Sequence, residues 1–340
     1  MPEFTDILNA VILMCNFMIV PALSYGSQLA LGALAVTLVY SVLRFANFAQ
    51  GDTMAFATGV TILTTWMLQN SGISFGFMPT AILAMPIAVI ACMAYILLID
   101  KFVYEYYRSQ NSKPITIVMA SVGVMFITGG IVRFVLGPSH QIFSDGARFI
   151  ITAREFKEMT GLSEGLAIKT SQFLTVTIAI MLVGFVFYFL QKTKTGKAMR
   201  AYSDNEDLAL LSGIDPTKVV RVTWILVAVL TTIAGVLYGL DKGFMAISYH
   251  QLLLPTFAAV IVGGIGSPIG AIVGGFVISF SELTMTYAYK KFLIYLLPEA
   301  LEPSGLVQFL STEYKFAISF VILVIVLLLR PTGIFKGKVI

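Results

Sequence analysis

Charged side chains are scarce in this chain of 340 residues: Asp, Glu, Lys and Arg together make up 12% of it. Soluble domains usually carry about 25%. Hydrophobic residues make up 58%, more than a soluble core of this size could bury. The composition therefore predicts an all-α polytopic membrane protein and argues against a soluble enzyme or a nucleic-acid-binding protein.

Cysteine and histidine are almost absent, with two of each. Cys15 and Cys92 are isolated in apolar segments, which indicates packing rather than a disulfide or a metal pair. His140 and His250 fall in predicted outer loops without a carboxylate pair at metal-ligand spacing. No G-x-x-x-x-G-K-[ST] run occurs either. We expect no metal, no cofactor bound by this chain and no catalytic residues.

The long uncharged runs predict about ten membrane spans, because one span needs about 20 apolar residues. All ten are expected to belong to a single membrane domain, 1–340, and ten spans permit two inverted five-helix halves. The first two spans are separated by a predicted break at Tyr25-Gly26. The approximate ranges are 8–24, 27–44, 53–69, 77–100, 115–136, 172–190, 220–240, 252–265, 269–287 and 314–330.

Lys and Arg in the short connections predict the orientation, because cytoplasmic loops are enriched in them. If 192–221 is cytoplasmic, alternation also places Arg44, 101–114 and the basic C-terminal tail inside. Both termini are then expected in the cytoplasm. Segments 137–171 and 288–313 would be extracytoplasmic, and the first of them could form a small lid or short helices.

Segment 192–221 is a long polar stretch between apolar spans. Ser203 and Glu206 have capping-box spacing, and Asp204, Glu206 and Asp207 suit the positive end of a helix dipole. Leucines follow, Gly213 is a helix stop, and Asp215-Pro216 starts the next helix. We predict a helix from Asp204 to Ser212. It is either an ordinary capped loop helix or a coupling helix that docks on a cytoplasmic partner.

Three further features could belong to a solute pathway or gate. The first is a glycine-rich run in which Gly266, Gly270 and Gly274 recur every four residues, as in close helix packing or a moving gate; its candidates are Gly263, Gly264, Gly266, Ser267 and Gly270. The second is Asn47 and Gln50, which line a pathway or form a cytoplasmic turn. The third is Glu282, an acid inside a predicted span that serves a function, snorkels or forms a packing hydrogen bond.

These motifs together resemble LivH-type permeases of branched-chain amino acid ABC transporters. The matching pieces are Gly196-Lys197-Ala198-Met199-Arg200-Ala201 with Asp207, Leu211 and Gly213-Ile214; Asn47-Phe48-Ala49 with Gly51; 259–267 with Gly270-Ala271 and Gly274-Gly275; and 329–335. The similarity covers roughly 27–335. Gln50 and Asp52 stand where the family usually has His and Glu, and the N-terminus and 288–313 are longer, so the solute stays open.

The resemblance implies an importer permease subunit in the bacterial inner membrane. Its partners would be a second permease (LivM-type, or a second copy), two cytoplasmic ATPases that bind ATP and Mg, a periplasmic solute-binding protein and lipid. It also implies that ATPase coupling uses residues of the polar stretch: Gly196, Arg200, Ser203, Asp204, Glu206, Asp207, Leu208, Leu211 and Gly213. The alternatives are an importer of urea or short amides, and an ion-coupled secondary transporter that uses Glu282.

Overall fold

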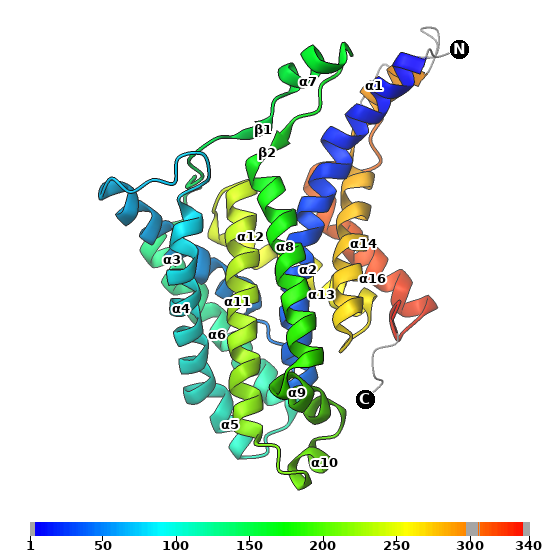
Figure 1. Ribbon diagram of the computed structural model, residues 1–340. Helices are drawn as coiled ribbons and strands as arrows, with labels where there is room; N and C mark the ends of the chain where they lie inside the picture. Colours follow the sequence, from blue (N-terminus) through cyan, green and yellow to red (C-terminus); the bar gives the residue numbers. More distant parts are fainter. Residues whose placement is uncertain (1–3, 297–304, 306, 336–340) are drawn as a thin grey trace.

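The protein is an elongated helical bundle in a computed structural model that describes residues 4–296, 305 and 307–335 (Figure 1). Its elements in chain order are α1 Phe4–Met14, a π-helical turn Cys15–Ile19, α2 Val20–Leu43, α3 Gln50–Asn70, α4 Ala81–Ile99, a π-helical turn Asp100–Tyr104, α5 Glu105–Ser109, α6 Pro114–Leu136, β1 Phe149–Ile151, α7 Ala153–Thr160, β2 Ile168–Lys169, α8 Thr170–Lys192, α9 Lys194–Asp204, α10 Glu206–Leu211, α11 Pro216–Lys242, α12 Ala246–Gln251, α13 Leu253–Gly263, α14 Pro268–Thr286, α15 Lys290–Leu296, a 3₁₀ turn Thr312–Tyr314 and α16 Lys315–Leu329.

Eight helical segments among the described residues are long and apolar enough to cross a membrane. They confirm an all-α multi-pass membrane protein. Helix α3 matches the predicted span 53–69 in position but is not among the eight. The eight segments are Phe4–Leu43, Ala81–Ser109, Pro114–Leu136, Thr170–Lys192, Pro216–Lys242, Ala246–Gly263, Pro268–Thr286 and Thr312–Leu329.

The predicted break at Tyr25-Gly26 is wrong, because both residues lie inside α2. Helical segments run without a loop from Phe4 to Leu43. Gly26 serves packing instead: a Cβ there would lie 2.6 Å from the Phe276 ring of α14. One helix thus replaces two predicted spans, and the described residues hold eight candidate spans rather than ten.

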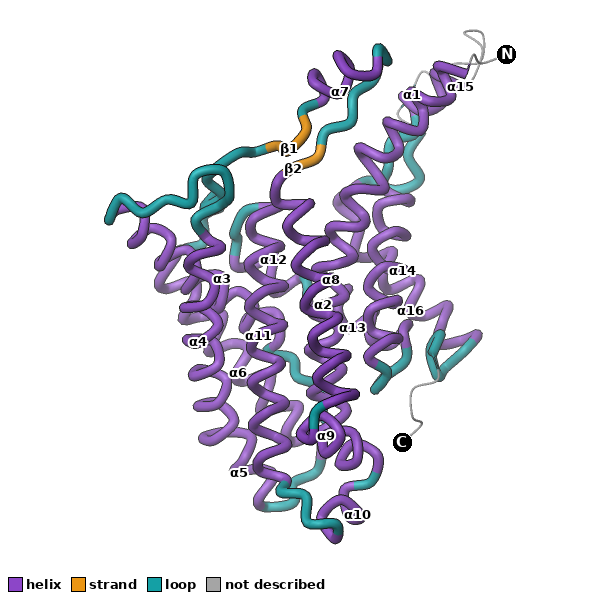
Figure 2. The backbone as a smooth tube through the Cα atoms, in the orientation of Figure 1, coloured by secondary structure: helices purple, strands orange, loops and turns teal. Residues whose placement is uncertain are grey.

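The two ends of the bundle carry different elements (Figures 1 and 2). Helices α9 and α10 lie at one end, which we call the α9 end. Helix α1, α15 and α7 lie at the opposite end, which we call the α1 end. The unbroken first helix therefore begins at the α1 end and finishes near α9.

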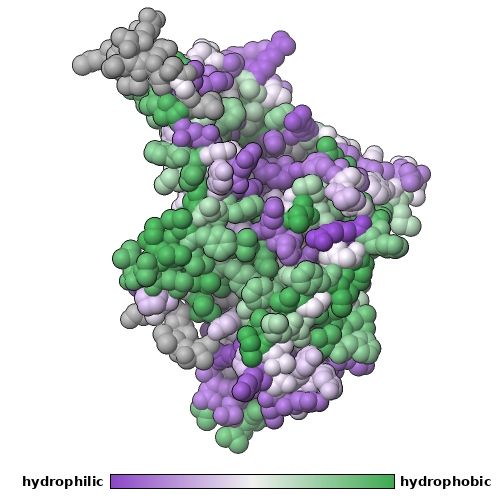
Figure 3. Space-filling view, turned by 180° about the vertical axis from the view of Figure 1, so that it is seen from behind, coloured by the Kyte–Doolittle hydropathy of each residue, from purple (hydrophilic) through white to green (hydrophobic). Residues whose placement is uncertain are grey.

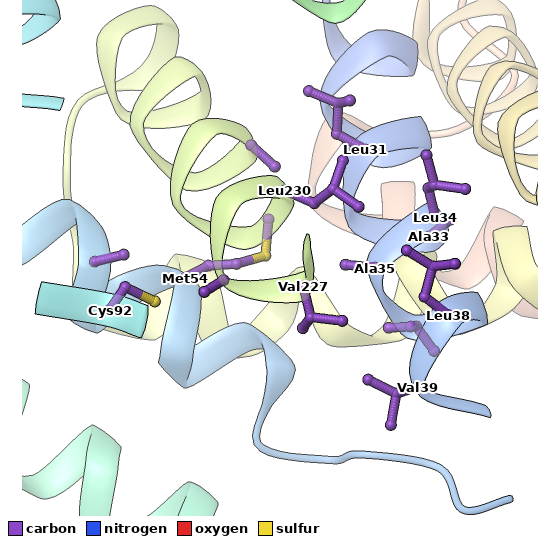
Figure 4. Close-up of a cluster of buried hydrophobic side chains, with 14 of the residues drawn as sticks. Leu31, Ala33, Leu34, Ala35, Leu38, Val39, Met54, Cys92, Val227 and Leu230 are labelled. Atoms are coloured by element: carbon purple, nitrogen blue, oxygen red, sulfur yellow. The ribbon is translucent and has the colours of Figure 1, made fainter. Parts of the chain in front are cut away.

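Helix α2 is the central element of the core. It packs against α8, α11, α13 and α14, and its residues from Ala22 to Val39 are almost all buried. A helix that is apolar on every side needs such complete cover. Figure 4 shows part of this core, where leucines and alanines of α2 face Met54 of α3 and Val227 and Leu230 of α11.

Large apolar side chains are also exposed around the bundle. Phe126 and Phe134 of α6 and Leu328 of α16 are more than two-thirds exposed. On the face shown in Figure 3, hydrophobic residues gather across the middle. Such a belt is what lipid or another membrane subunit would cover.

The predicted outer segments contain little regular structure. In 137–171, β1 and β2 pair antiparallel and flank α7, whose capping box joins Thr152 and Glu155. Asn9 of α1 and Asn16 of the π-helical turn that follows it hold this segment, because they bond to backbone groups between Glu164 and Ala167. In 288–313 the structure describes α15, while 297–304 and 306 lie outside the described residues.

Candidate functional site

Helix α9 is fixed firmly to the bundle. Thr193 caps its first turn by accepting a hydrogen bond from Gly196 N–H at 3.0 Å. A Cβ on Gly196 would overlap backbone atoms of Phe189 and Leu190, so only glycine permits this close turn. Met199 and Tyr202 are buried against the core. These contacts make α9 a rigid support for the residues that follow.

The predicted cap of the next helix is wrong. Ser203 and Asp204 are the last residues of α9, and Asn205 is the cap of α10, accepting from Leu208 N–H at 3.0 Å. Helix α10 therefore spans Glu206–Leu211 rather than Asp204–Ser212. Glu206 does not reach back to Ser203; its carboxylate accepts a hydrogen bond from the Tyr202 hydroxyl.

The predicted stop and restart are confirmed. Gly213 has a φ of +79°, and the N–H groups of Gly213 and Ile214 bond back to carbonyls of Leu210 and Ala209. Asp215 then caps α11 by accepting from Thr217 N–H at 2.9 Å, with Pro216 in the first helical turn.

Helix α10 presents a mixed apolar and acidic surface. Leu208 is 60% exposed and Leu211 85%, while Ala209 is buried against α9. Glu206 and Asp207 are exposed beside the leucines. Burial, and then the bond to Glu206, raises the pKa of Tyr202, so this hydroxyl remains a donor at neutral pH. The exposed leucines have no cover within the described part of the chain.

A groove of about 620 Å³ lies beside α9. It brings together two sets of predicted residues: Arg200, Ser203 and Asp204 from the polar stretch, and Gly266 and Ser267 from the glycine-rich run. The Arg44 guanidinium at the end of α2 donates to the Ser203 carbonyl, close to this groove. The end of α2, the α9–α10 junction and the α13–α14 turn are thus joined in one place.

The glycine-rich run forms a tight helix contact. A Cβ on Gly263 would overlap the Gly270 carbonyl, and one on Gly274 would overlap the Ala259 carbonyl. Gly264 has a φ of +112° and lies against the Phe335 backbone, while Ile334 N–H donates to Val262 O at 2.9 Å. These contacts confirm close packing of α13, α14 and the 330–335 segment; a gating role is still a prediction.

Asn47 and Gln50 are both buried, with 5% and 1% of their surface exposed. The Asn47 side-chain oxygen accepts from Ala49 N–H and the Tyr104 hydroxyl, and the Gln50 amide donates to Thr231 Oγ1 at 2.7 Å. These bonds fix the start of α3 inside the bundle. In this structure both residues hold the helix start and face protein rather than open space.

One polar pair, Asp52 and His250, was not predicted from the sequence. His250, predicted to lie in an outer loop, is on α12, and its Nδ1 lies 3.0 Å from Asp52 Oδ2. The Asp52 side chain is 3% exposed and the imidazole 36%, so the histidine connects a buried acid to the surface of the bundle. Gly129 of α6 packs on the other oxygen of Asp52. No sequence periodicity places residues 52 and 250 together.

Glu282 is buried on α14, with 2% of its surface exposed. It accepts a hydrogen bond from the Ser319 hydroxyl of α16. The predicted packing hydrogen bond is thus present, whereas snorkelling is excluded because the carboxylate faces inward. At the same end of the bundle as Glu282, two backbone hydrogen bonds between Gln141 and Phe244 hold the loop that follows α6.

These features define a class of protein. Apolar spans enclose buried polar residues, and an ordered polar extension stands at one end; this is the organisation of a membrane transport component. Among the described residues, no group of three or more His, Cys, Asp or Glu side chains is arranged to hold a metal.

The family model for the branched-chain amino acid transport system permease component matches residues 18–327, so the chain belongs to that family. It is a permease component of a transport system rather than an enzyme. LivH of Escherichia coli K12, named as a high-affinity branched-chain amino acid transport system permease protein, is 28% identical over 315 residues and 91% of each chain.

Two further relatives have similar coverage. A probable LivH of Methanocaldococcus jannaschii is 29% identical, over 92% of this chain and 90% of its own. BraD of Pseudomonas aeruginosa is 24% identical, over 93% and 94%. Among solved structures, PsaBC from Streptococcus pneumoniae in complex with Fab aligns with 99% of this chain and 93% of that chain, with a TM-score of 0.44 and 12% identity.

Proposed function

We propose that this chain forms half of the membrane pore of an ATP-driven importer for branched-chain or related amino acids. Two cytoplasmic ATPases would dock at the α9 end, a second permease of LivM type or a second copy would complete the pore, and a periplasmic protein would deliver solute at the α1 end. Family membership and the solute named for LivH and BraD support the solute class.

The observation that carries the proposal is the exposed surface of α10 on its rigid support. Leu208 and Leu211 offer apolar area, with Asp207 beside them. The Arg44–Ser203 contact links this surface to the central helix α2. Force applied by an ATPase at α10 would thus reach the core directly. Gly196, Arg200 and Gly213 serve this role by shaping and flanking the surface.

The docking proposal is tested in the reconstituted complex with Leu211→Glu and Asp207→Lys. We expect solute uptake to fall at least about tenfold, as for loss of an interface hot spot, while membrane insertion is unchanged. Glu158→Lys, an exposed charge reversal on α7 at the other end, is the matched control. Unchanged uptake and co-purification of the ATPase with both α10 variants would show that α10 is not the docking surface.

The orientation follows from the same assignment. With the α9 end in the cytoplasm, we expect Phe4 outside and the 330–335 segment inside, because helical segments run without a loop from Phe4 to Leu43; this differs from the expectation of two cytoplasmic termini. A cysteine at Ser212 should resist a membrane-impermeant maleimide in intact cells, and one at Thr160 should react. The reverse pattern would invert the topology.

Uptake experiments distinguish the proposed function from other solutes and other transport mechanisms. A urea or short-amide importer would accumulate those solutes, not leucine, with its own binding protein. An ion-coupled transporter would accumulate solute without any ATPase when given a proton or sodium gradient. The inverted five-helix repeat is still a prediction, to be tested by superposing the two halves of an experimental structure.

A further inference from the structure

A small chamber of about 150 Å³ lies near the α1 end, between α2, α11, α14 and the start of α16. An engineered cavity of about this volume is large enough to bind benzene. The polar side chains that line this chamber carry both signs of charge and four hydroxyl groups: Tyr25, Tyr238, Lys242, Glu282, Thr286, Thr312 and Lys315.

Two buried polar atoms of this chamber have no hydrogen-bond partner among the described residues. They are Glu282 Oε2 and the Tyr25 hydroxyl, on residues that are 2% and 6% exposed. Glu282 Oε1, in contrast, is occupied by the Ser319 hydroxyl. A buried polar group without a partner is costly, and most native ones are satisfied. The Tyr25 hydroxyl and the Glu282 carboxylate lie close enough to interact with each other, so a ligand would bind between them and take the hydroxyl as a donor and Oε2 as an acceptor.

A cation and an anion also share the chamber without touching. No ion pair within the described part of the chain involves Glu282 or Lys315. The Lys315 ammonium lies instead over aromatic rings, 4.7 Å from the Phe316 centroid and 6.0 Å from that of Tyr25. Lys242 is partly engaged, with Nζ 3.4 Å from Asp241. Separated opposite charges fit a ligand that carries both.

We propose that this chamber binds the head group of a free zwitterionic α-amino acid, an inference that rests on the solute class proposed above. The ligand ammonium would donate to Glu282 Oε2, and the Tyr25 hydroxyl would donate to the ligand carboxylate. That carboxylate would also face Lys315, with Lys242 at the rim. Pro21 and Leu283, which complete the wall, offer apolar contacts for the side chain.

The chamber has a route to solvent. A hollow of about 470 Å³ shares Leu283, Thr286 and Thr312 with it and adds Lys291 at the rim. Both openings lie at the ends of α14 and α16 rather than in mid-membrane. A solute released at the α1 end could thus reach Glu282 without crossing the bundle.

The test crosses two variants with three ligands in the purified permease–ATPase complex, with the binding protein left out. Competition against radiolabelled L-leucine is measured for L-leucine, for L-leucinol, which lacks the carboxylate, and for 4-methylpentanoate, which lacks the ammonium. Glu282→Gln should raise the inhibition constants of leucine and leucinol roughly ten- to a hundredfold, the range for losing a hydrogen bond to a charged group. The inhibition constant of 4-methylpentanoate should not change. Lys315→Met should weaken leucine and 4-methylpentanoate and spare leucinol.

Matched controls are Glu158→Gln and Lys157→Met on α7, which change exposed groups outside the chamber and its route to solvent and should leave all three inhibition constants unchanged. If Glu282→Gln does not fold, the Lys315→Met pattern decides alone. If the inhibition constants of all three ligands rise equally, or none of them changes, the proposal is overturned.

Uptake into vesicles separates the two proposals. If the complete wild-type system accumulates leucine with ATP and its binding protein, but the variants lack this ligand pattern, only the chamber assignment fails. If the wild type accumulates no amino acid, the proposed function itself fails.

Discussion

At the α9 end the chain packs backbone on backbone. Gly263, Gly270 and Gly274 bring α13 and α14 into direct contact, and Arg44 closes onto Ser203. At the α1 end, Glu282 and Tyr25 face a chamber with unused hydrogen-bonding capacity. The first arrangement suits a part that transmits displacement without yielding. The second arrangement lowers stability, because its buried polar groups gain full hydrogen bonding only when a ligand binds.

Gly270→Leu should have the largest effect, because its side chain would overlap the Gly263 backbone and force α13 and α14 apart. We expect loss of folded protein, well above the 1–3 kcal/mol typical of overpacking. Size-exclusion chromatography and thermal unfolding measure this. Gly184→Leu on α8, where nothing lies within 4 Å, is the control and should fold normally. Normal folding of Gly270→Leu would show that the α9 end is not rigid.

Arg44→Ala should lower the free energy of unfolding by about 2 kcal/mol, because the Ser203 carbonyl loses a charged donor. Arg44 also has a φ of +59°, which costs a non-glycine residue about 1 kcal/mol. Arg44→Gly should therefore be less destabilising than Arg44→Ala by about that amount. Denaturant unfolding gives both values; an alanine variant as stable as the wild type would contradict the linkage.

The same Tyr→Phe substitution at two positions should change the free energy of unfolding in opposite directions. The Tyr249 hydroxyl donates to Gly235 O at 2.9 Å, so Tyr249→Phe should cost about 1 kcal/mol. The Tyr25 hydroxyl is buried without a partner, so Tyr25→Phe should be neutral or stabilising by up to about 1 kcal/mol. Tyr25→Phe should nevertheless weaken leucine binding. A clear loss of stability in Tyr25→Phe would mean that the Tyr25 hydroxyl already has a hydrogen-bond partner without a ligand.

The smallest effect is expected at Asp145, in the loop at the α1 end. Burial alone would raise the pKa of this carboxyl, but bonds from the Thr80 hydroxyl, the Gln69 amide and the Thr80 backbone lower it below its ordinary value. Because the folded-state pKa is lowered, the stabilisation is complete above about pH 3.9, the ordinary value, and is lost as pH falls through the lowered pKa.

The fluorescence of Trp66, one turn before Gln69, follows this transition in a Trp224→Phe background. Asp145→Asn should remove the acid transition while the rest of the pH profile is unchanged. Identical profiles for the two proteins would exclude a role of Asp145 in holding the loop.

Local chain chemistry made much of the fold predictable. Gly213 and Asp215-Pro216 mark their helix ends correctly because a left-handed residue and a side-chain cap depend on a few neighbouring residues. The same local logic failed at Ser203. Helix α9 continues through that residue because Met199 and Tyr202 bury its inner face, and the next cap moves to Asn205.

Long-range packing was not predictable. Gly26 reads as a break in sequence, but it is where α2 contacts Phe276 of α14. The pairing of Asp52 with His250 joins residues nearly 200 positions apart and depends on α12 turning back into the bundle. Glu282 could be singled out because an acid within an apolar run is rare; its chamber, made by four helices, could not be.

The unbroken helix from Phe4 to Leu43 is about 60 Å long at 1.5 Å per residue, twice the hydrocarbon thickness of a bilayer. Geometrically it is a lever that is followed by Arg44 at the α9 end and carries Asn9 near the α1 end. A rigid tilt of one degree about the α9 end moves the α1 end by about 1 Å. Asn9 and Asn16 would carry that travel to the segment around Glu164. A displacement at the α9 end would thereby reach the α1 end without any solute moving between them.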